Sequence, residues 1–196
     1  MLDYRIAAVC GAALGAALAA RSKYERKSLS VEETEVFSDR LTRDWIFVFL
    51  SDLHENEFGP ENEQLIAAID RIKPDGILIG GDLIVTKKRQ ARTRVSETLL
   101  AALASRYPIY CGNGNHESRM RWRKEEYKDG YEQYRAYLKK LGICLLEDQS
   151  VWIGDEIRVS GLELDPCFYK KAYSKKLALM DQAYIEKKLG PASRDH

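Results

Sequence analysis

Three short apolar runs, each followed by a polar cluster and then by a helical pattern, constrain the fold of this chain more than any other feature. The runs cover residues 45–50, 77–79 and 109–111. Uninterrupted apolar runs of this length are typical of strands buried on both faces. Strands that alternate with helices form βαβ units, so the sequence predicts an α/β fold with a parallel sheet. The apolar positions at helical spacing are Leu65, Ile66, Ile69, Ile72, Val95, Leu99, Leu100 and Leu103.

The segments outside these units have other patterns. Tyrosine and leucine residues recur at helical spacing from Tyr127 to Leu141 and predict a helix whose tyrosines pack in the core or against a subunit. Beyond Gly142, close-set apolar segments predict short strands that form hairpins in a second sheet. The weaker pattern of residues 28–44 leaves room for a short leading strand. A last helix is expected from Leu177 to Leu189.

The amino-terminal segment differs in composition from the rest. Residues 6–20 carry no charge, and four basic residues follow between Arg21 and Lys27. Three interpretations compete: a membrane anchor, the core of a signal peptide ending near Ala19, and a buried helix. The uncharged stretch is short for a helix that spans a bilayer, which needs about 20 apolar residues. The basic cluster nevertheless favours a membrane anchor formed by residues 1–27. Residues 28–196 would then form a membrane-associated domain on the cytoplasmic side.

Charge and cysteine content limit the partners and the compartment. The 31 Lys and Arg residues nearly balance the 30 Asp and Glu residues, which gives a formal net charge of +1. No nucleic-acid partner is therefore implied, although a local basic patch could still bind one. The four cysteines are widely spaced and include no CxxC pair. They are expected to be reduced thiols, in a reducing compartment.

Polar clusters follow the three apolar runs, at residues 51–54, 80–82 and 112–117. Ligands of open α/β sheets bind at the carboxyl ends of the strands, so the three clusters should converge on one site. Each cluster alone has an ordinary interpretation: Asp82 could cap a helix, His54 could be a loop histidine, and residues 115–117 could be a capping turn. Two of the three histidines of the chain fall in these clusters, which favours a common metal site.

The residue types in the clusters suit metal chemistry. Asp52 and His54 are two positions apart, which would place a carboxylate and an imidazole on one side of the chain. Asp82 follows two glycines and could bridge two cations, and Asn115 offers a neutral oxygen. His116 should point elsewhere and be free to donate a proton or a hydrogen bond. Two cations roughly 3.5–4 Å apart would clamp the oxygens of an in-line displacement.

The ordered motifs resemble those of the calcineurin-like metallophosphoesterase family. They are Asp-x-His, Gly-Asp and Gly-Asn-His-Glu at residues 52–54, 81–82 and 114–117, and the resemblance covers residues 46–164. Residues 51–54 with Phe58 and Gly59 are similar to the membrane-associated bacterial branch of that family.

The resemblance implies a four-layer α/β/β/α sandwich that holds two divalent metal ions, often manganese, iron or zinc. Asp52 and His54 would bind the first ion, Asp82 would bridge both ions, and Asn115 would bind the second. His116 would be the general acid or the stabiliser of the transition state.

The chain departs from the family pattern in two places. Many members have a carboxylate three residues after the bridging aspartate, where it can orient the catalytic histidine, but this chain has Val85. Glu117 or another acid could take that role, or His116 could act unassisted. The later Gly-His and Gly-His-x-His motifs of the family are absent, and His196 is expected to be an ordinary residue. The fold is therefore expected to be incomplete at the carboxyl terminus, and this chain could itself be inactive.

The function implied by the resemblance is hydrolysis of a phosphomonoester or phosphodiester by water that two metal ions activate. A lipid-linked phosphoester is one possible substrate. Two alternatives remain: a nucleotide phosphodiesterase or nuclease on the same scaffold, and a non-catalytic membrane-bound module that binds metal.

Overall fold

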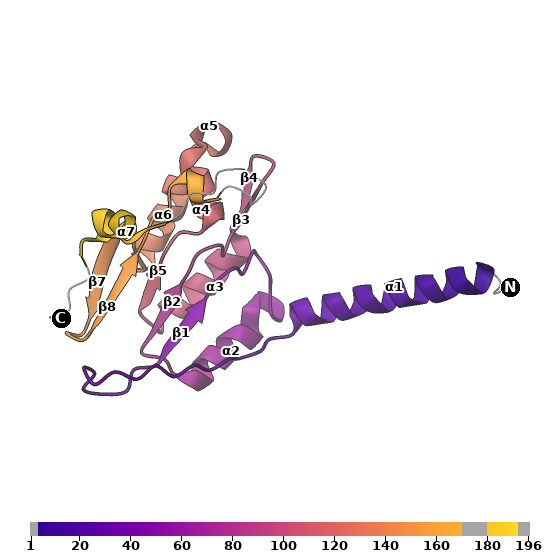
Figure 1. Ribbon diagram of the computed structural model, residues 1–196, viewed down its shortest axis with the longest axis horizontal. Helices are drawn as coiled ribbons and strands as arrows, with labels where there is room; N and C mark the ends of the chain where they lie inside the picture. Colours follow the sequence, from indigo (N-terminus) through magenta and orange to yellow (C-terminus); the bar gives the residue numbers. More distant parts are fainter. Residues whose placement is uncertain (1–3, 170–179, 192–196) are drawn as a thin grey trace.

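The first sheet of the protein has four parallel strands in the order β1-β2-β5-β6 (Figure 1). These observations come from a computed structural model, which describes residues 4–169 and 180–191. The neighbouring strands pair in parallel register throughout the sheet. The strands are β1 (Phe47–Leu50), β2 (Gly76–Ile79), β5 (Ile109–Cys111) and β6 (Cys144–Leu145).

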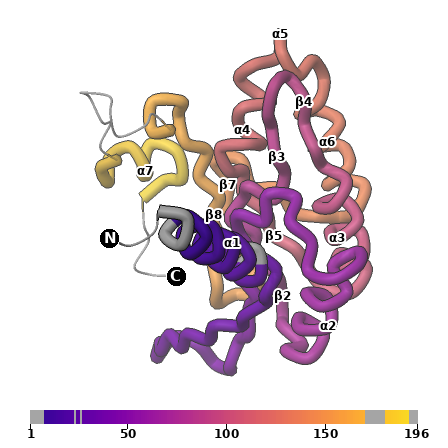
Figure 2. The backbone as a smooth tube through the Cα atoms, turned by 90° about the vertical axis from the view of Figure 1, so that its right-hand side faces the viewer, coloured from indigo at the N-terminus to yellow at the C-terminus, as the bar shows by residue number. Residues whose placement is uncertain are grey.

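Three helices cover one face of this sheet, and Figure 2 shows them on the side opposite to the β7–β8 hairpin. They are α2 (Glu63–Ile72), which follows the 3-10 turn η1 (Pro60–Asn62), α3 (Arg94–Ala104) and α6 (Gly130–Lys140). Their apolar stripes pack on β2 and β5 to form the core, where Ile77, Leu100 and Leu138 are fully buried. The α/β fold with a parallel sheet, predicted from the alternation of strand and helix patterns, is therefore confirmed.

The second sheet is the antiparallel hairpin of β7 (Gln149–Ile153) and β8 (Ile157–Gly161). It is followed by η2 (Pro166–Tyr169) and α7 (Gln182–Leu189), which contacts β7. The second sheet confirms one part of the prediction for residues 143–161. The other part is wrong, because β6 pairs with β5 in the first sheet and joins no hairpin.

Three details of the predicted elements need correction. No strand forms among residues 28–46. The strand β1 is at the edge of its sheet, and Phe49 is 66% exposed, so this strand is not buried on both faces. The long tyrosine helix is interrupted between α5 (Lys124–Tyr127) and α6, where Lys128 has a left-handed φ of 51°. Leu177 and His196 lie outside the described residues.

A short antiparallel hairpin, which the sequence patterns did not predict, lies between β2 and α3. Its strands are β3 (Val85–Lys87) and β4 (Gln90–Arg92). It contacts the helix α4 (Asn115–Trp122) through β3 and α5 through β4. The hairpin is too short for its hydrophobic pattern to be recognised, since each strand has only three residues.

The amino-terminal helix α1 (Tyr4–Lys27) extends away from the rest of the molecule (Figure 1). Val9, Leu14 and Leu18 are exposed on it, so the interpretation of this segment as a buried helix is wrong. Among the described residues, no helix combines the length and the apolar character that crossing a bilayer requires.

Candidate metal centre

The three polar clusters meet at the carboxyl ends of β1, β2 and β5, as the parallel order of these strands requires. Backbone hydrogen bonds join the loop after β1 to the loop after β2. The amide of Asp52 donates to the carbonyl of Gly81 at 3.1 Å, and the amide of His54 donates to that of Asp82 at 3.0 Å. The convergence that was predicted for clusters far apart in sequence is present in the structure.

Glycines allow the loop after β2 and the loop after β5 to touch through their backbones. A Cβ atom on Gly81 would overlap the amide of Gly114, and one on Gly114 would overlap the carboxylate of Asp82. Gly81 also has a left-handed φ of 96°. Gly81 therefore needs glycine both for conformation and for space, and Gly114 needs it for space.

Asp82 is buried between the loops, with a left-handed φ of 53°. Its Oδ1 accepts a hydrogen bond of 2.8 Å from the amide of His116, and its Oδ2 accepts one from Nδ2 of Asn115. Asp52 and His54 also have positive φ values, of 55° and 49°. Left-handed backbone in residues other than glycine is sterically unfavourable, and it is commonly concentrated at functional sites.

Asp52 and His54 lie side by side in front of Asp82. Oδ1 of Asp52 is 3.5 Å from Nε2 of His54, so both side chains face the same side of the chain, as predicted. The cause differs from the prediction. The left-handed backbone at both residues brings the side chains together, whereas the prediction relied on the alternation of side chains in an extended strand. Their side chains are more open than Asp82, with 66% of Asp52 and 42% of His54 exposed.

The ligand atoms of His54, Asp82 and His116 all lie within 4.8 Å of one another, so this cluster could hold a metal ion. Carboxylate oxygens with an imidazole nitrogen suit manganese, iron and zinc alike. The donor set of the site therefore fits the divalent metals that the sequence motifs imply, without selecting one of them.

Thr86 fixes the ring of His116. The amide of Thr86 donates to Nδ1 of His116 at 2.8 Å, and the hydroxyl of Thr86 lies 2.9 Å from the same nitrogen. An amide can only donate, so Nδ1 carries a lone pair and the neutral ring has its proton on Nε2. Burial, the main effect, lowers the pKa of His116, which favours this neutral ring. A ring in this state donates a hydrogen bond at Nε2, while its Nδ1 lone pair is occupied by the amide of Thr86.

Glu117 is 1% exposed and binds the backbone of two loops. Its Oε2 accepts from the amides of Asp82 at 2.9 Å and Gly114 at 3.0 Å, and its Oε1 accepts from that of Leu83 at 3.1 Å. Burial raises the pKa of Glu117 to about 6, against the lowering effect of these donors. The idea that Glu117 orients His116 is wrong, because its carboxylate faces the loop amides and Thr86 holds the histidine.

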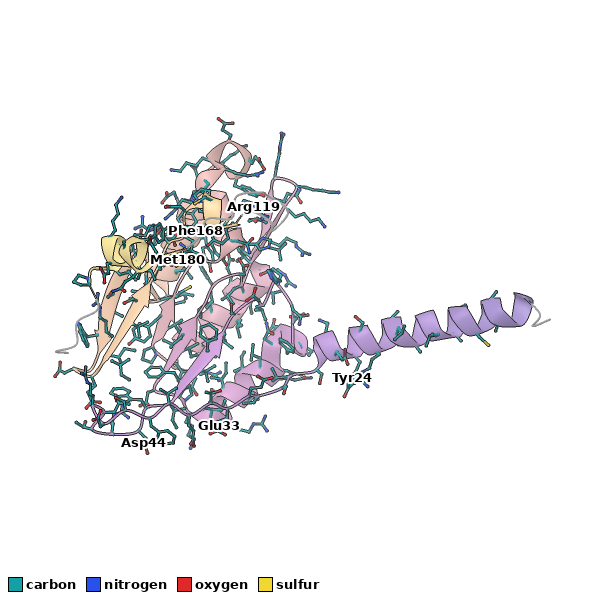
Figure 3. All side chains as sticks on the ribbon, viewed as in Figure 1. Tyr24, Glu33, Asp44, Arg119, Phe168 and Met180 are labelled. Atoms are coloured by element: carbon teal, nitrogen blue, oxygen red, sulfur yellow. The ribbon has the colours of Figure 1, made fainter. Side chains whose placement is uncertain are left out.

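Asn115 is the first residue of α4, and its amide group lies against Asp82. In the structure Nδ2 of Asn115 faces Asp82, while its Oδ1 accepts a hydrogen bond of 3.4 Å from Nη2 of Arg119. The amide must turn before its oxygen can bind an ion held by Asp82. Figure 3 shows Arg119 near the base of the β3–β4 hairpin, where its Nη1 donates to the carbonyl of Thr86 at 3.0 Å.

A buried network of polar side chains holds the loop after β5 in place. Asn113 donates through Nδ2 to Glu163 at 2.6 Å and to the hydroxyl of Tyr131 at 2.5 Å. Glu163 is 2% exposed, and Arg121 pairs with it at 3.0 Å. A buried carboxylate needs such a partner, because its desolvation is otherwise costly. Burial is the main cause that raises the pKa of Glu163.

Several of these supporting residues could not be recognised from the sequence patterns. Thr86, Arg119 and Glu163 carry no motif that connects them to the site. Glu55 was also missed: its carboxylate accepts from the amides of Val95 and Ser96 at 3.0 and 2.9 Å and so caps α3. The nearest available signal was the position of Glu55 directly after the Asp-x-His motif.

Comparison with known proteins agrees with this site. The family model for calcineurin-like phosphoesterases matches residues 46–175, which is more than half of the chain. The chain therefore belongs to the calcineurin-like phosphoesterase family, and this membership indicates metal-dependent hydrolysis of phosphoesters. No curated protein and no solved structure matched the chain.

Proposed function

We propose that this chain hydrolyses a phosphomonoester or a phosphodiester with two divalent metal ions, manganese, iron or zinc, at the carboxyl end of its first sheet. The observation that carries the proposal is the convergence of Asp52, His54 and Asp82 in front of His116, whose Nε2–H is the free donor of its ring. Metal ligands and a separate proton donor within one small site are the combination that phosphoester hydrolysis needs.

The ligand roles follow the position of each side chain. Asp52 and His54, which lie together at the open side of the site, would hold the first ion. The buried Asp82 would bridge both ions, because it lies between the His54 side and the Asn115 side. Asn115 would hold the second ion through its oxygen after its amide turns. When bound, divalent cations neutralise charge on the phosphate and lower the pKa of water.

His116 would donate from Nε2 to the phosphate or to the leaving oxygen. The hydrogen bond from the amide of Thr86 to Nδ1 keeps the proton on the opposite nitrogen, and the edge contact with His54, at a ring distance of 5.0 Å, limits rotation of the ring. A donor that is already oriented loses little free energy to reorganisation during the reaction.

Metal binding and turnover of the full chain test this function separately. Isothermal titration with Mn²⁺ should detect binding that Asp82→Ala removes. Hydrolysis of mono- and bis-(p-nitrophenyl) phosphate with Mn²⁺ should fall at least about a hundredfold in His116→Ala, while that variant still binds Mn²⁺. Asp155→Ala removes an exposed turn carboxylate and is the matched control.

Two results would contradict the proposal. If the wild-type chain binds Mn²⁺ but hydrolyses neither substrate, a metal-binding module without catalysis replaces the enzyme. If Asp155→Ala weakens Mn²⁺ binding as much as Asp82→Ala does, the ion is not held at this site.

We also infer that α1 attaches the chain to a membrane surface. Support comes from the exposed Val9, Leu14 and Leu18 on a helix that extends away from the domain, and from Arg21 after them. Flotation with anionic lipid vesicles should carry the wild-type chain and leave Leu14→Asp/Leu18→Asp behind. Equal flotation of both proteins would contradict attachment through α1.

A further inference from the structure

The hairpin of β3 and β4 carries an unusual concentration of positive charge. Residues 85–94, here called the basic hairpin, contain five basic side chains, and no acidic residue occurs between Asp82 and Glu97. The whole chain has a formal net charge of only +1, so this local excess is not a feature of the average composition. The basic residues are Lys87, Lys88, Arg89, Arg92 and Arg94.

The turn of the basic hairpin gives no local reason for these residues. Lys88 and Arg89 both have left-handed backbone, with φ values of 51° and 62°. Two-residue turns of this kind favour asparagine and glycine, because other residues are strained there. Two long basic side chains are therefore present in spite of the turn conformation.

The charges of the basic hairpin are not neutralised within the molecule. Residues 87–92 are all exposed, and none of the ion pairs among residues 4–169 and 180–191 includes a side chain of the basic hairpin. Other basic residues nearby are paired: Arg121 contacts Glu147 and Glu163, and Arg123 contacts Glu126. Unpaired cations grouped on one element attract anions from solution.

The basic hairpin begins at the candidate metal centre. Its residue Thr86 donates to the ring of His116 at 2.8 Å, and Arg119 joins Thr86 to Asn115 through its two terminal nitrogens. Lys88 is the first residue of the turn, two residues after Thr86 and about 7 Å from it at the rise of an extended chain. An anion held by Lys87, Lys88 and Arg89 would therefore lie next to a phosphate held in front of His116.

We propose that the basic hairpin binds a second phosphate group of the substrate, one that is not hydrolysed, so that the substrate is a compound with several phosphates and not a simple monoester. This inference rests on the proposed function, because it places the hydrolysed phosphate at His116. A small polyphosphorylated ligand is favoured over nucleic acid, because the excess charge is confined to one hairpin and the chain as a whole has almost no net charge.

Binding of inorganic tripolyphosphate to the full chain in metal-free buffer tests the proposal without turnover. Isothermal titration should give tighter binding of tripolyphosphate than of orthophosphate. The variant Lys87→Gln/Lys88→Gln/Arg89→Gln should bind tripolyphosphate about tenfold more weakly and with a smaller salt dependence. The matched control, Arg71→Gln/Lys139→Gln/Lys140→Gln, removes the same charge from exposed positions elsewhere and should bind as the wild-type chain does.

Three outcomes would overturn the proposal. Tripolyphosphate could bind no tighter than orthophosphate, or the two triple variants could lose affinity equally, which would show a general charge effect. A single-stranded DNA of about 20 nucleotides could bind more tightly than tripolyphosphate and depend on the same residues, which would make the partner a nucleic acid.

The same titration separates this proposal from the proposed function. Asp82→Ala should retain tripolyphosphate binding in metal-free buffer, because Asp82 is not part of the basic hairpin. If the wild-type chain binds tripolyphosphate through the hairpin but hydrolyses neither p-nitrophenyl substrate, the result counts against the enzyme. Turnover of p-nitrophenyl phosphates by the wild-type chain with no hairpin binding would count against the second phosphate site alone.

Discussion

The two halves of the candidate metal centre differ in how firmly the fold holds them. Asp52 and His54 are exposed side chains on a loop, and Oδ1 of Asp52 lies 3.5 Å from Nε2 of His54. Asp82, by contrast, is 6% exposed and lies between two glycine-dependent loops that the buried carboxylate of Glu117 joins. We infer that the half with Asp82 is organised before any ion binds, whereas the half with Asp52 and His54 is left open for ligands and substrate.

Removal of Glu117 should have the largest effect on this comparison. Glu117→Ala leaves several buried amides of the Asp82 and Gly114 loops without an acceptor, so we expect a loss of about 3–5 kcal/mol in the free energy of unfolding. Urea denaturation without metal measures it. Glu125→Ala, at an exposed position, should change stability by less than about 0.5 kcal/mol. Similar values for the two variants would show that the Glu117 side is no firmer than the surface.

Substitution of Gly81 should have the next largest effect. Gly81→Ala adds a methyl group that overlaps the amide of Gly114, at a backbone φ of 96°. The strain and the overlap together should cost about 2–4 kcal/mol, measured by thermal denaturation.

Gly142→Ala is the matched control for this overlap. Gly142 also has a left-handed φ, of 74°, but a Cβ there meets nothing within 4 Å. It should cost only about 1–2 kcal/mol. A cost for Gly81→Ala no larger than that would contradict the close contact of the two loops.

The ionisation of Glu117 should make stability depend on pH. Its pKa of about 6 lies above the ordinary value of 4.5, so the folded state binds the proton more tightly than the unfolded state. This contribution is fully present below pH 4.5 and is lost as the pH rises through 6. The difference corresponds to about 2 kcal/mol. Urea denaturation between pH 4.5 and 7, compared with Glu117→Gln, should show this decrease in the wild-type chain only.

Thr86 should have a smaller effect on stability and a specific effect on His116. Thr86→Val removes the hydroxyl of a buried side chain but keeps the amide that binds Nδ1, so we expect a loss of about 1 kcal/mol. Nitrogen NMR at a pH where the ring is neutral should show the proton on Nε2 in the wild-type chain and in Thr86→Val. A proton on Nδ1 in the wild-type chain would exclude the orientation described here.

Substitution on the open side of the site should have the smallest effect on the folded chain. Asp52→Ala should change the free energy of unfolding without metal by less than about 0.5 kcal/mol, because the Asp52 side chain is 66% exposed. The same variant should bind Mn²⁺ more weakly. A large loss of stability would show that the loop after β1 is as firmly organised as the loop after β2, and the contrast between the two halves would be lost.

The hydrophobic patterns were sufficient for the α/β units. Apolar residues at helical spacing and short buried runs depend on neighbours in the chain, so α2, α3, β2 and β5 follow the predictions closely. The predictions failed where a segment forms a strand only if a neighbouring strand can pair with it. The strand β6 pairs with the edge of β5 that β2 leaves open, and this pairing places β6 in the first sheet. Residues 28–46 pair with no strand. The assignments of Asp52, His54, Asp82, Asn115 and His116 to metal and catalysis stay predictions, although the structure brings these residues together.

The sequence by itself determined that Asp52, His54, Asp82 and His116 would follow the ends of parallel strands, because the alternation of strand and helix is local information. Only the tertiary structure decided which group orients His116 and which groups fasten the two loops. Thr86 and Glu117 act through contacts with backbone amides, and such contacts depend on the three-dimensional path of the chain and leave no pattern of residue types.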